Sequence, residues 1–144
     1  MSVYIDTSAL AKWYVREPRS DDFEAFINEA GQGVIARLAV VEFRCLLARR
    51  RRAATIARSA ETAAFRAFEH DARDGYWRIE PVSDAHMLGA LDVLEKVKSI
   101  PLRTLDALHL AVALAIGAER LATADRVMAQ AAKSLRIPTI TFFD

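Results

Sequence analysis

The sequence predicts a three-layer α/β/α fold, in which helices cover both faces of a mainly parallel central sheet. Short β-like runs alternate along the chain with longer segments whose apolar residues recur at helical spacing. Strands separated by helices need crossover connections, and such connections favour parallel pairing. No linker, internal repeat or low-complexity tract interrupts the 144 residues, so we expect one domain over residues 1–144.

Caps and breakers delimit the elements of the first half. Pro18 closes the first helix, and Ser20 begins a second helix with acids in its first turn, where the helix dipole favours them. Gly31 ends that helix. We expect strands at 3–5 and 34–35 and helices at 9–15, 20–30, 38–52 and 54–72.

The second half shows the same alternation. Ser83 and Asp84 cap a helix, Pro101 precedes the next one, and Gly117 ends it. We expect strands at 78–82, 121–123 and 139–142 and helices at 84–97, 104–116 and 125–135.

The helix over 38–52 carries Leu38, Val41, Cys45 and Ala48 on one side. We interpret Cys45 as a small core residue. It is the only cysteine, which excludes an internal disulfide and fits a reducing compartment, so we expect a cytoplasmic protein. No apolar run reaches the roughly 18–20 residues that span a bilayer, and no membrane association is expected.

Four acidic residues stand inside otherwise apolar segments. They are Asp6, Glu42, Asp106 and Asp125. A carboxylate is costly in apolar surroundings unless it is paired, hydrogen-bonded or bound to metal. Asp6 directly follows one strand and Asp125 lies just past another, so both should stand at the edge where parallel sheets bind ligands. Clustered carboxylates repel one another and favour a hard divalent cation, Mg²⁺ or Mn²⁺.

Each acid also has a purely structural interpretation. Asp6 could cap the helix that follows it, and Asp106 and Asp125 could serve helix starts in the same way. Glu42 could lie on a solvated helix face. A cap and a metal ligand are compatible, because a carboxylate has two oxygens. His109, one turn after Asp106, could support the metal ligands, but we favour a packed helix histidine.

Arginine dominates the positive charge, with 16 of the 20 basic residues, although the net charge is only +1. Guanidinium groups bind phosphate bidentately, so the bias could indicate a phosphate-binding surface. A general compositional preference for arginine also explains it, and we favour that explanation. The densest run comprises Arg49, Arg50, Arg51 and Arg52. It is either a solvated helix end or a phosphate clamp beside the acidic site.

Taken together, these residues resemble those of PIN-domain ribonucleases, most closely the VapC-type toxins of toxin–antitoxin pairs. The resemblance spans nearly the whole chain and rests on four motifs. They are Asp6-Thr7-Ser8-Ala9-Leu10, Glu42, Leu105-Asp106-Ala107-Leu108-His109-Leu110-Ala111 and Thr123-Ala124-Asp125. One departure is Ala36-Arg37, where relatives often carry Ser or Thr before the helix that bears the glutamate.

The resemblance implies a PIN-like fold with the four acids around Mg²⁺ or Mn²⁺, and with Ser8 and Thr123 orienting them. It also implies a homodimer, and a small VapB-like antitoxin that wraps the toxin and obstructs its site. The expected activity is that of an endoribonuclease that hydrolyses RNA in line and leaves a 5′-phosphate and a 3′-hydroxyl. Arg103 or the arginines at 49–52 would hold flanking phosphates.

Two other functions remain open. A non-catalytic PIN module would bind RNA or a protein, and it would lack one or more of the acids. A free-standing nuclease of RNA maturation would share the chemistry but have no antitoxin, and a short overlapping upstream gene would distinguish the toxin from it.

Overall fold

A five-stranded parallel sheet forms the centre of the computed structural model, which describes residues 2–144. The strands are β1 (Val3–Ile5), β2 (Gly33–Ala36), β3 (Trp77–Glu80), β4 (Arg120–Thr123) and β5 (Thr139–Thr141). Their order across the sheet is β3-β2-β1-β4-β5, and every neighbouring pair is parallel. The predicted parallel sheet is therefore confirmed, with all five strands at the expected places.

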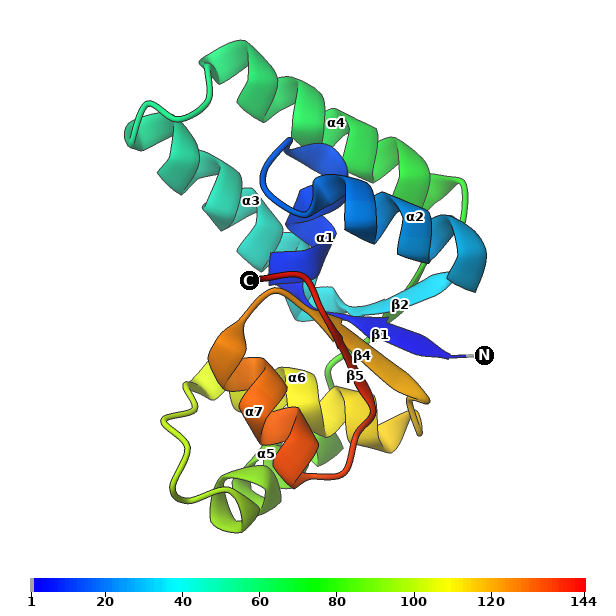
Figure 1. Ribbon diagram of the computed structural model, residues 1–144, viewed down its shortest axis with the longest axis vertical. Coiled ribbons are helices and arrows are strands. Elements are labelled where there is room, and N and C mark those ends of the chain that lie inside the picture. The colour runs from blue at the N-terminus through cyan, green and yellow to red at the C-terminus, as the bar shows by residue number, and fades with distance from the viewer. Residues whose placement is uncertain (1) are drawn as a thin grey trace.

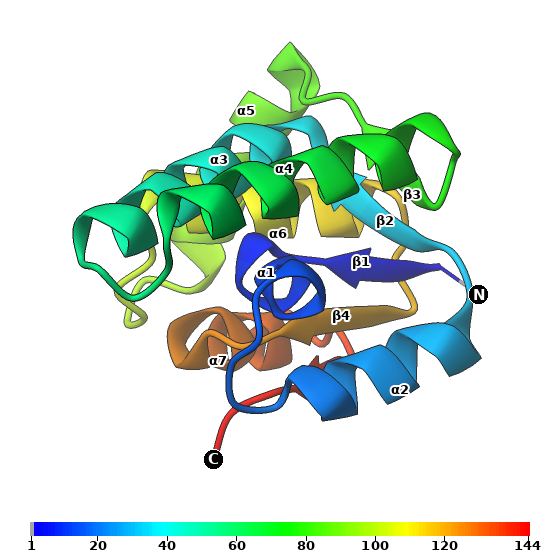
Figure 2. The same cartoon turned by 90° about the horizontal axis from the view of Figure 1, so that it is seen from above.

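Seven helices within residues 2–144 cover the two faces of the sheet. They are α1 (Thr7–Tyr14), α2 (Ser20–Ala30), α3 (Arg37–Arg52), α4 (Arg58–Arg73), α5 (Asp84–Lys96), α6 (Thr104–Ala115) and α7 (Arg126–Ser134). Figure 1 shows α1–α4 on one side of the sheet and α5–α7 on the other, which confirms the three-layer α/β/α fold. In Figure 2, α3 and α4 lie side by side over the β2 half of the sheet.

Alternation along β1 divides the apolar interior into two cores. Val3 and Ile5 belong to the core under α1–α4, whereas Tyr4 faces the core under α5–α7. All three side chains are fully buried. The first core is rich in aromatic side chains such as Phe43, which is fully buried and whose replacement by alanine would cost about 3–5 kcal/mol. These two cores hold the helices against the sheet and fix the direction in which each strand end points.

The predicted apolar side of α3 does not face the core. Val41 is 65% exposed and Cys45 is exposed, so the interpretation of Cys45 as a core residue was wrong. The buried side of the helix carries Ala39, Phe43 and Leu47 instead. Both sets recur at helical spacing, and α1 and α4 cover the one that carries Phe43, whose ring packs against Tyr14 and Phe68.

The helix expected from residue 54 begins four residues later, at Arg58. Residues 53–57 form the connection between α3 and α4, and Ala54 adopts a left-handed conformation with φ 59°. The Thr55 hydroxyl and backbone N–H both bond the Arg50 carbonyl, which closes the end of α3. This alanine-rich connection contains no glycine or proline, so no breaker separated it from the helix in the sequence.

Gly33 in β2 is required by packing. A Cβ there would collide with the Ile5 side chain of β1 and would press on the Trp77 ring of β3.

β1 lies between β2 and β4, so the chain turns to opposite sides of it. The carboxyl ends of β1 and β4 flank this switch point, where open α/β sheets bind ligands.

Candidate metal centre

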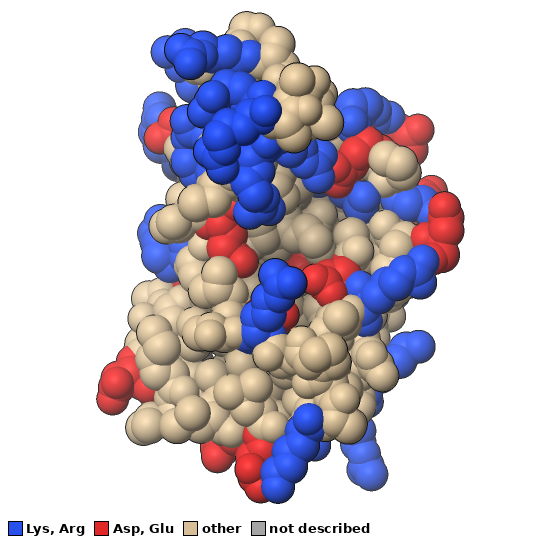
Figure 3. All heavy atoms as spheres, turned by 90° about the vertical axis from the view of Figure 1, so that its left-hand side faces the viewer, with Lys and Arg blue, Asp and Glu red and all other residues tan. Residues whose placement is uncertain are grey.

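All four predicted acids line one cavity of about 620 Å³ at the carboxyl edge of the sheet. They come from four elements or their caps: the end of β1, the middle of α3, the first turn of α6 and the end of β4. Figure 3 views this edge and shows acidic side chains in the middle of the face, beneath a large group of basic ones. The structure thus brings together Asp6, Glu42, Asp106 and Asp125.

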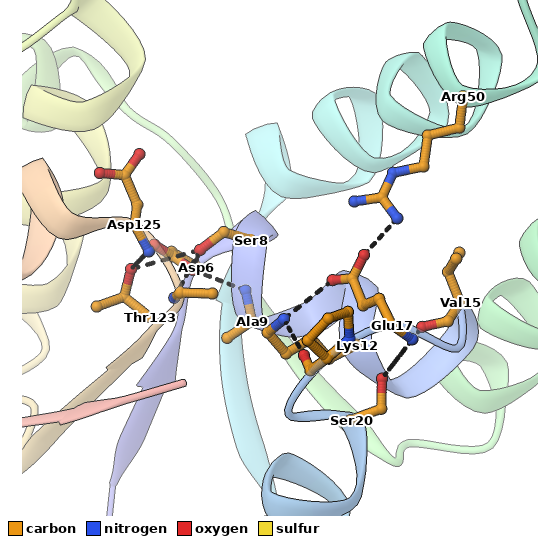
Figure 4. Close-up of polar contacts among 12 residues, drawn as sticks. Asp6, Ser8, Ala9, Lys12, Val15, Glu17, Ser20, Arg50, Thr123 and Asp125 are labelled. Carbon is orange, nitrogen blue, oxygen red and sulfur yellow. Dashed lines mark hydrogen bonds and ion pairs between the residues drawn. The ribbon is translucent and has the colours of Figure 1, made fainter. Parts of the chain in front are cut away.

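Asp6 is the N-cap of α1 and is only 2% exposed. Its Oδ1 accepts the Ala9 backbone N–H at 3.0 Å and the Ser8 hydroxyl at 2.7 Å. Its Oδ2 accepts the Thr123 hydroxyl at 2.5 Å. Asp6 is therefore both a helix cap and a member of the acidic cluster, and three donors fix its orientation (Figure 4).

Ser8 and Thr123 also connect the ends of β1 and β4. The Ser8 hydroxyl accepts the Ala124 N–H at 2.8 Å, and the Thr123 hydroxyl accepts the Asp125 N–H at 2.9 Å. Each hydroxyl donates to Asp6 while it accepts from the backbone of the β4–α7 connection. Two small side chains thus hold the two strand ends in register.

Asp106 and Asp125 both cap helix starts. Asp106 Oδ2 accepts the Arg103 N–H at 3.1 Å, and Asp125 Oδ1 accepts the Met128 N–H at 3.0 Å. Within the described chain, the other carboxylate oxygen of each residue has no hydrogen-bond partner. The cap and the ligand interpretations are therefore compatible, because each aspartate keeps one oxygen available.

Glu42 Oε1 accepts two hydrogen bonds from other elements. The Thr7 hydroxyl of α1 donates to it at 2.9 Å, and His109 Nε2 of α6 lies 2.6 Å away. The Glu42 side chain is 23% exposed, so it does not lie on a fully solvated helix face. His109 is 2% exposed and contacts both Glu42 and the Tyr4 hydroxyl. Packing alone, the interpretation favoured for His109, was therefore incomplete.

Two of the carboxyl groups are electrostatically perturbed. Burial raises the pKa of Asp6, although the neighbouring His109 and the hydrogen bonds from Ser8, Thr123 and Ala9 oppose this effect. Partial burial also raises the pKa of Asp106, and the neighbouring carboxylates of Asp125 and Glu42 add to the rise. The site therefore disfavours its own negative charge, which is the condition that a bound cation relieves.

The predicted phosphate-binding arginines fall into two groups. Arg49 and Arg103 line the acidic cavity and are exposed. Arg50 forms an ion pair with Glu17, which also accepts a bond from Lys12 at 3.2 Å (Figure 4). These contacts leave Arg50 engaged in the packing of the α1–α2 connection against α3.

Arg51 and Arg52, like Arg50, do not line the acidic cavity. Arg51 donates to the buried Glu61 of α4 at 2.6 Å, and Arg44 donates to the same carboxylate at 3.0 Å. Arg52 is exposed at the last turn of α3, beside a second hollow that Arg49 and Arg50 also line. Only part of the arginine run is therefore free to meet a ligand in the acidic cavity.

The donor chemistry of the cavity fits a hard divalent cation, because it offers four carboxylates and the hydroxyl groups of Thr7, Ser8 and Thr104. Within residues 2–144, no three His, Cys, Asp or Glu side chains form a closed ligand set around one point. The oxygens that lack a partner belong to Glu42, Asp106 and Asp125, whereas both Asp6 oxygens accept hydrogen bonds. These three partner-free oxygens of the described chain are the ones available to a cation.

Comparison with known proteins identifies the family. A family model described as the PIN domain matches residues 3–134. The chain is also 34% identical over 142 residues to Ribonuclease VapC46 of Mycobacterium tuberculosis, and the match covers 96% of each chain. The chain belongs to the PIN-domain family.

Solved structures share the fold of this PIN domain. VapC20 of Mycobacterium tuberculosis, described as a sarcin–ricin loop cleaving toxin, superposes with a TM-score of 0.70 at 20% identity, over 90% of this chain and 94% of VapC20. A chain of a toxin–antitoxin complex from Klebsiella pneumoniae superposes with a TM-score of 0.63 at 15% identity, over 99% and 98% of the two chains.

Sequence reasoning about this PIN domain underestimated one group of residues. Thr7 and Tyr4 were not singled out, yet both are hydrogen-bonded into the site through Glu42 and His109. For His109, the signal in the sequence was its spacing: it follows Asp106 by three residues, which places both on one side of α6.

Among residues 2–144, none of the helices is both long and apolar enough to cross a membrane.

Proposed function

We propose that the chain is a divalent-metal-dependent endoribonuclease of the VapC type, acting as the toxin of a type II toxin–antitoxin pair in the cytoplasm. The observation that carries the proposal is the convergence of four carboxylates from distant segments on one cavity. Membership of the PIN family and the 34% identity to a protein named as a ribonuclease support the same reaction. Residues 1–144 would form one catalytic domain.

Asp6, Glu42, Asp106 and Asp125 would hold Mg²⁺ or Mn²⁺. When bound, the ion would neutralise charge on the scissile phosphate and lower the pKa of the attacking water. Ser8 and Thr123 keep the Asp6 carboxylate fixed by their hydrogen bonds. The expected products carry a 5′-phosphate and a 3′-hydroxyl.

Arg49 and Arg103 would bind phosphates of the RNA on either side of the scissile bond. Both line the cavity and are exposed, and guanidinium groups match phosphate oxygens bidentately. The acidic cavity repels RNA by itself, so these cations would contribute to binding before and during cleavage. Arg50 and Arg51 would contribute less, because Glu17 and Glu61 engage them.

A VapB-like antitoxin is the proposed protein partner. Support comes from the VapC name of the relative and from the toxin–antitoxin complex among the fold neighbours. We also infer a homodimer. Helix α5 exposes Met87, Leu88 and Leu91 by 50%, 61% and 63%, an apolar surface that a second copy would cover. Light scattering of the purified protein and of a Leu88→Ala/Leu91→Ala variant would test this.

The deciding experiment is cleavage of a labelled pool of structured RNAs by the purified, antitoxin-free protein. It would be run with Mg²⁺, with Mn²⁺ and with EDTA, and with the variants Asp6→Asn and Asp92→Asn. Asp92 is exposed on α5 and supplies the same charge change away from the cavity. Cleavage that is lost in EDTA and in Asp6→Asn, but kept in Asp92→Asn, is expected. Equal cleavage by all three proteins would contradict the proposed centre.

A further inference from the structure

A chain of polar side chains runs from the core of the protein to Glu42. Tyr4 on β1 is fully buried, and its hydroxyl lies 2.5 Å from His109 Nδ1. His109 Nε2 lies 2.6 Å from Glu42 Oε1, to which Thr7 also donates at 2.9 Å. Buried polar groups among apolar side chains are costly unless each has a partner, so a fully paired chain of this kind specifies one arrangement.

The partners of His109 determine where its proton lies. An ionised carboxylate only accepts hydrogen bonds, so Nε2 must carry the proton that faces Glu42. In a neutral imidazole Nδ1 is then an acceptor, and the Tyr4 hydroxyl is the donor that faces it. With this assignment each group has a partner, and no buried side-chain N or O atom within residues 2–144 is left without one. The direction of donation runs from Tyr4 to His109 to Glu42.

The local structure of α3 does not fix Glu42 by other means. The N-cap of α3 is Ala36, which provides no side-chain hydrogen bond. Glu42 therefore depends on donors from neighbouring elements: Thr7 on α1 and His109 on α6. Both reach the same oxygen, Oε1, and Oε2 has no hydrogen-bond partner in the described chain.

We propose that His109 is a positioning residue for the reaction, because it is held by Tyr4 and fixes Glu42 Oε1 so that Oε2 is the oxygen offered to the cation and its water. This inference rests on the proposed function. It gives the buried imidazole a role that packing does not require, since an apolar side chain of similar volume would fill the same space without needing two polar partners.

Paired substitutions separate this role from a merely structural one. The side-chain amide nitrogen of glutamine reaches about as far as imidazole Nε2, whereas that of asparagine reaches only as far as Nδ1. His109→Gln should therefore keep a donor to Glu42, and His109→Asn should lose it. Tyr4→Phe removes only the hydroxyl that selects the tautomer. Val112→Ala is the control, because Val112 is fully buried on the same helix but is not hydrogen-bonded to Glu42.

The first readout is Mn²⁺ binding by the metal-free protein without RNA, measured by calorimetry. His109→Asn should weaken binding about 10- to 100-fold, the usual effect of losing a group that orients a metal ligand. His109→Gln should restore most of the affinity, and Val112→Ala should leave it unchanged while lowering the melting temperature. In cleavage, His109→Asn should lower kcat and change KM for RNA little, because Arg49 and Arg103 remain.

Equal Mn²⁺ affinity in wild type and a folded His109→Asn protein would overturn the inference, as would a His109→Gln protein that loses as much as His109→Asn. If His109→Asn does not fold, nitrogen NMR of the wild type decides: the inference requires a proton on Nε2 and none on Nδ1, and the reverse contradicts it. Wild-type protein that neither binds Mn²⁺ nor cleaves RNA would instead contradict the proposed function together with the inference.

Discussion

The Thr123 hydroxyl donates to Asp6 Oδ2 over 2.5 Å, although the two residues stand 117 positions apart in the chain. The same hydroxyl accepts the Asp125 N–H at 2.9 Å, so one side chain fixes two of the four acids. Thr123 is fully buried at the end of β4, so its side chain is shielded from solvent. The geometry of the candidate centre thus depends on a residue that need not touch the substrate.

Replacing Thr123 by valine keeps the shape and removes both hydrogen bonds. We expect RNA cleavage to fall about 10- to 100-fold, because a misoriented Asp6 binds the cation less well. The Asp125 N–H would also lose its acceptor, which should lower stability by about 1–3 kcal/mol. Cleavage and chemical denaturation of Thr123→Val would be compared with Thr123→Ser, which keeps the hydroxyl. Full activity in the valine variant would show that Asp6 does not need this support.

Asp6→Asn should stabilise the metal-free protein while it abolishes cleavage. Burial raises the pKa of Asp6 above the value of about 3.9 expected in the unfolded chain. Between the two pKa values the folded state binds more protons than the unfolded state, so stability falls as pH rises through that window. The cost is fully present above the folded-state pKa, and removing the charge there should raise the stability of the metal-free protein.

Denaturation in EDTA at several pH values would measure this effect. The advantage of Asp6→Asn should shrink as pH falls through the raised pKa of Asp6, because the wild-type carboxyl is then protonated. Asp92→Asn, exposed on α5, should show no such advantage. A neutral-pH Asp6→Asn protein that is less stable than wild type would mean that hydrogen bonding to the charged form outweighs the cost of burial.

Arg49 and Arg51 are close in sequence, but substitution of Arg49 should affect RNA binding, whereas substitution of Arg51 should affect stability. Arg49→Gln should weaken RNA binding roughly tenfold, the loss of one charge-assisted contact, without changing stability. It should also lower the slope of log affinity against log salt by about 0.7. Arg51→Gln should leave RNA binding unchanged and lower stability, because Arg51 pairs with Glu61. Binding to RNA in EDTA and thermal unfolding test both, and identical behaviour would refute the division.

Glu61 should stabilise the folded protein at neutral pH but not at acidic pH. The hydrogen bond from Arg44 lowers the pKa of Glu61, and Arg51 adds to this effect. A lowered pKa stabilises the fold above the unfolded value of about 4.3, and that contribution is lost as pH falls through the folded pKa. Glu61→Gln should therefore be less stable than wild type at neutral pH, and the difference should disappear as pH falls through the lowered pKa of Glu61.

The control for this prediction is Glu69→Gln, an exposed position on the same helix. It should unfold like the wild type at every pH. A constant difference between Glu61→Gln and wild type across the whole range would mean that shape, and not charge, makes Glu61 stabilising.

Much of the fold was predictable because each strand is short, apolar and bounded by caps or breakers. Ser83 and Gly31 delimit helices in the structure as their chemistry predicts. Ser20 is the first residue of α2, but it does not cap the helix, because the N-cap is Arg19 and makes no side-chain capping hydrogen bond. The late start of α4 was not predictable, since Ala54 turns the chain in a left-handed conformation that alanine rarely adopts. There the connection between α3 and α4 overrides local propensity.

The candidate site shows the same division. The four acids could be found because a carboxylate in an apolar segment is unusual, and strand ends indicate where two of them lie. The partners of Arg50 and Arg51 could not be found, because they depend on how α3 packs against α4 and the α1–α2 connection. The sequence also could not show which side of α3 is exposed, because both sides of that helix carry apolar residues. Cys45 lies on the exposed side and lines the cavity.

The pairing of β1 with β4 gives the candidate site a particular order of assembly. Asp6 directly follows β1, whereas Thr123 is the last residue of β4 and Asp125 lies just after it. A chain interrupted before Arg120 would have α1 and α3 but neither the β4 edge nor two of the groups that complete the acidic cavity. A ribosome making this protein would thus hold a polypeptide without the complete acidic cavity until residues 120–125 have been added.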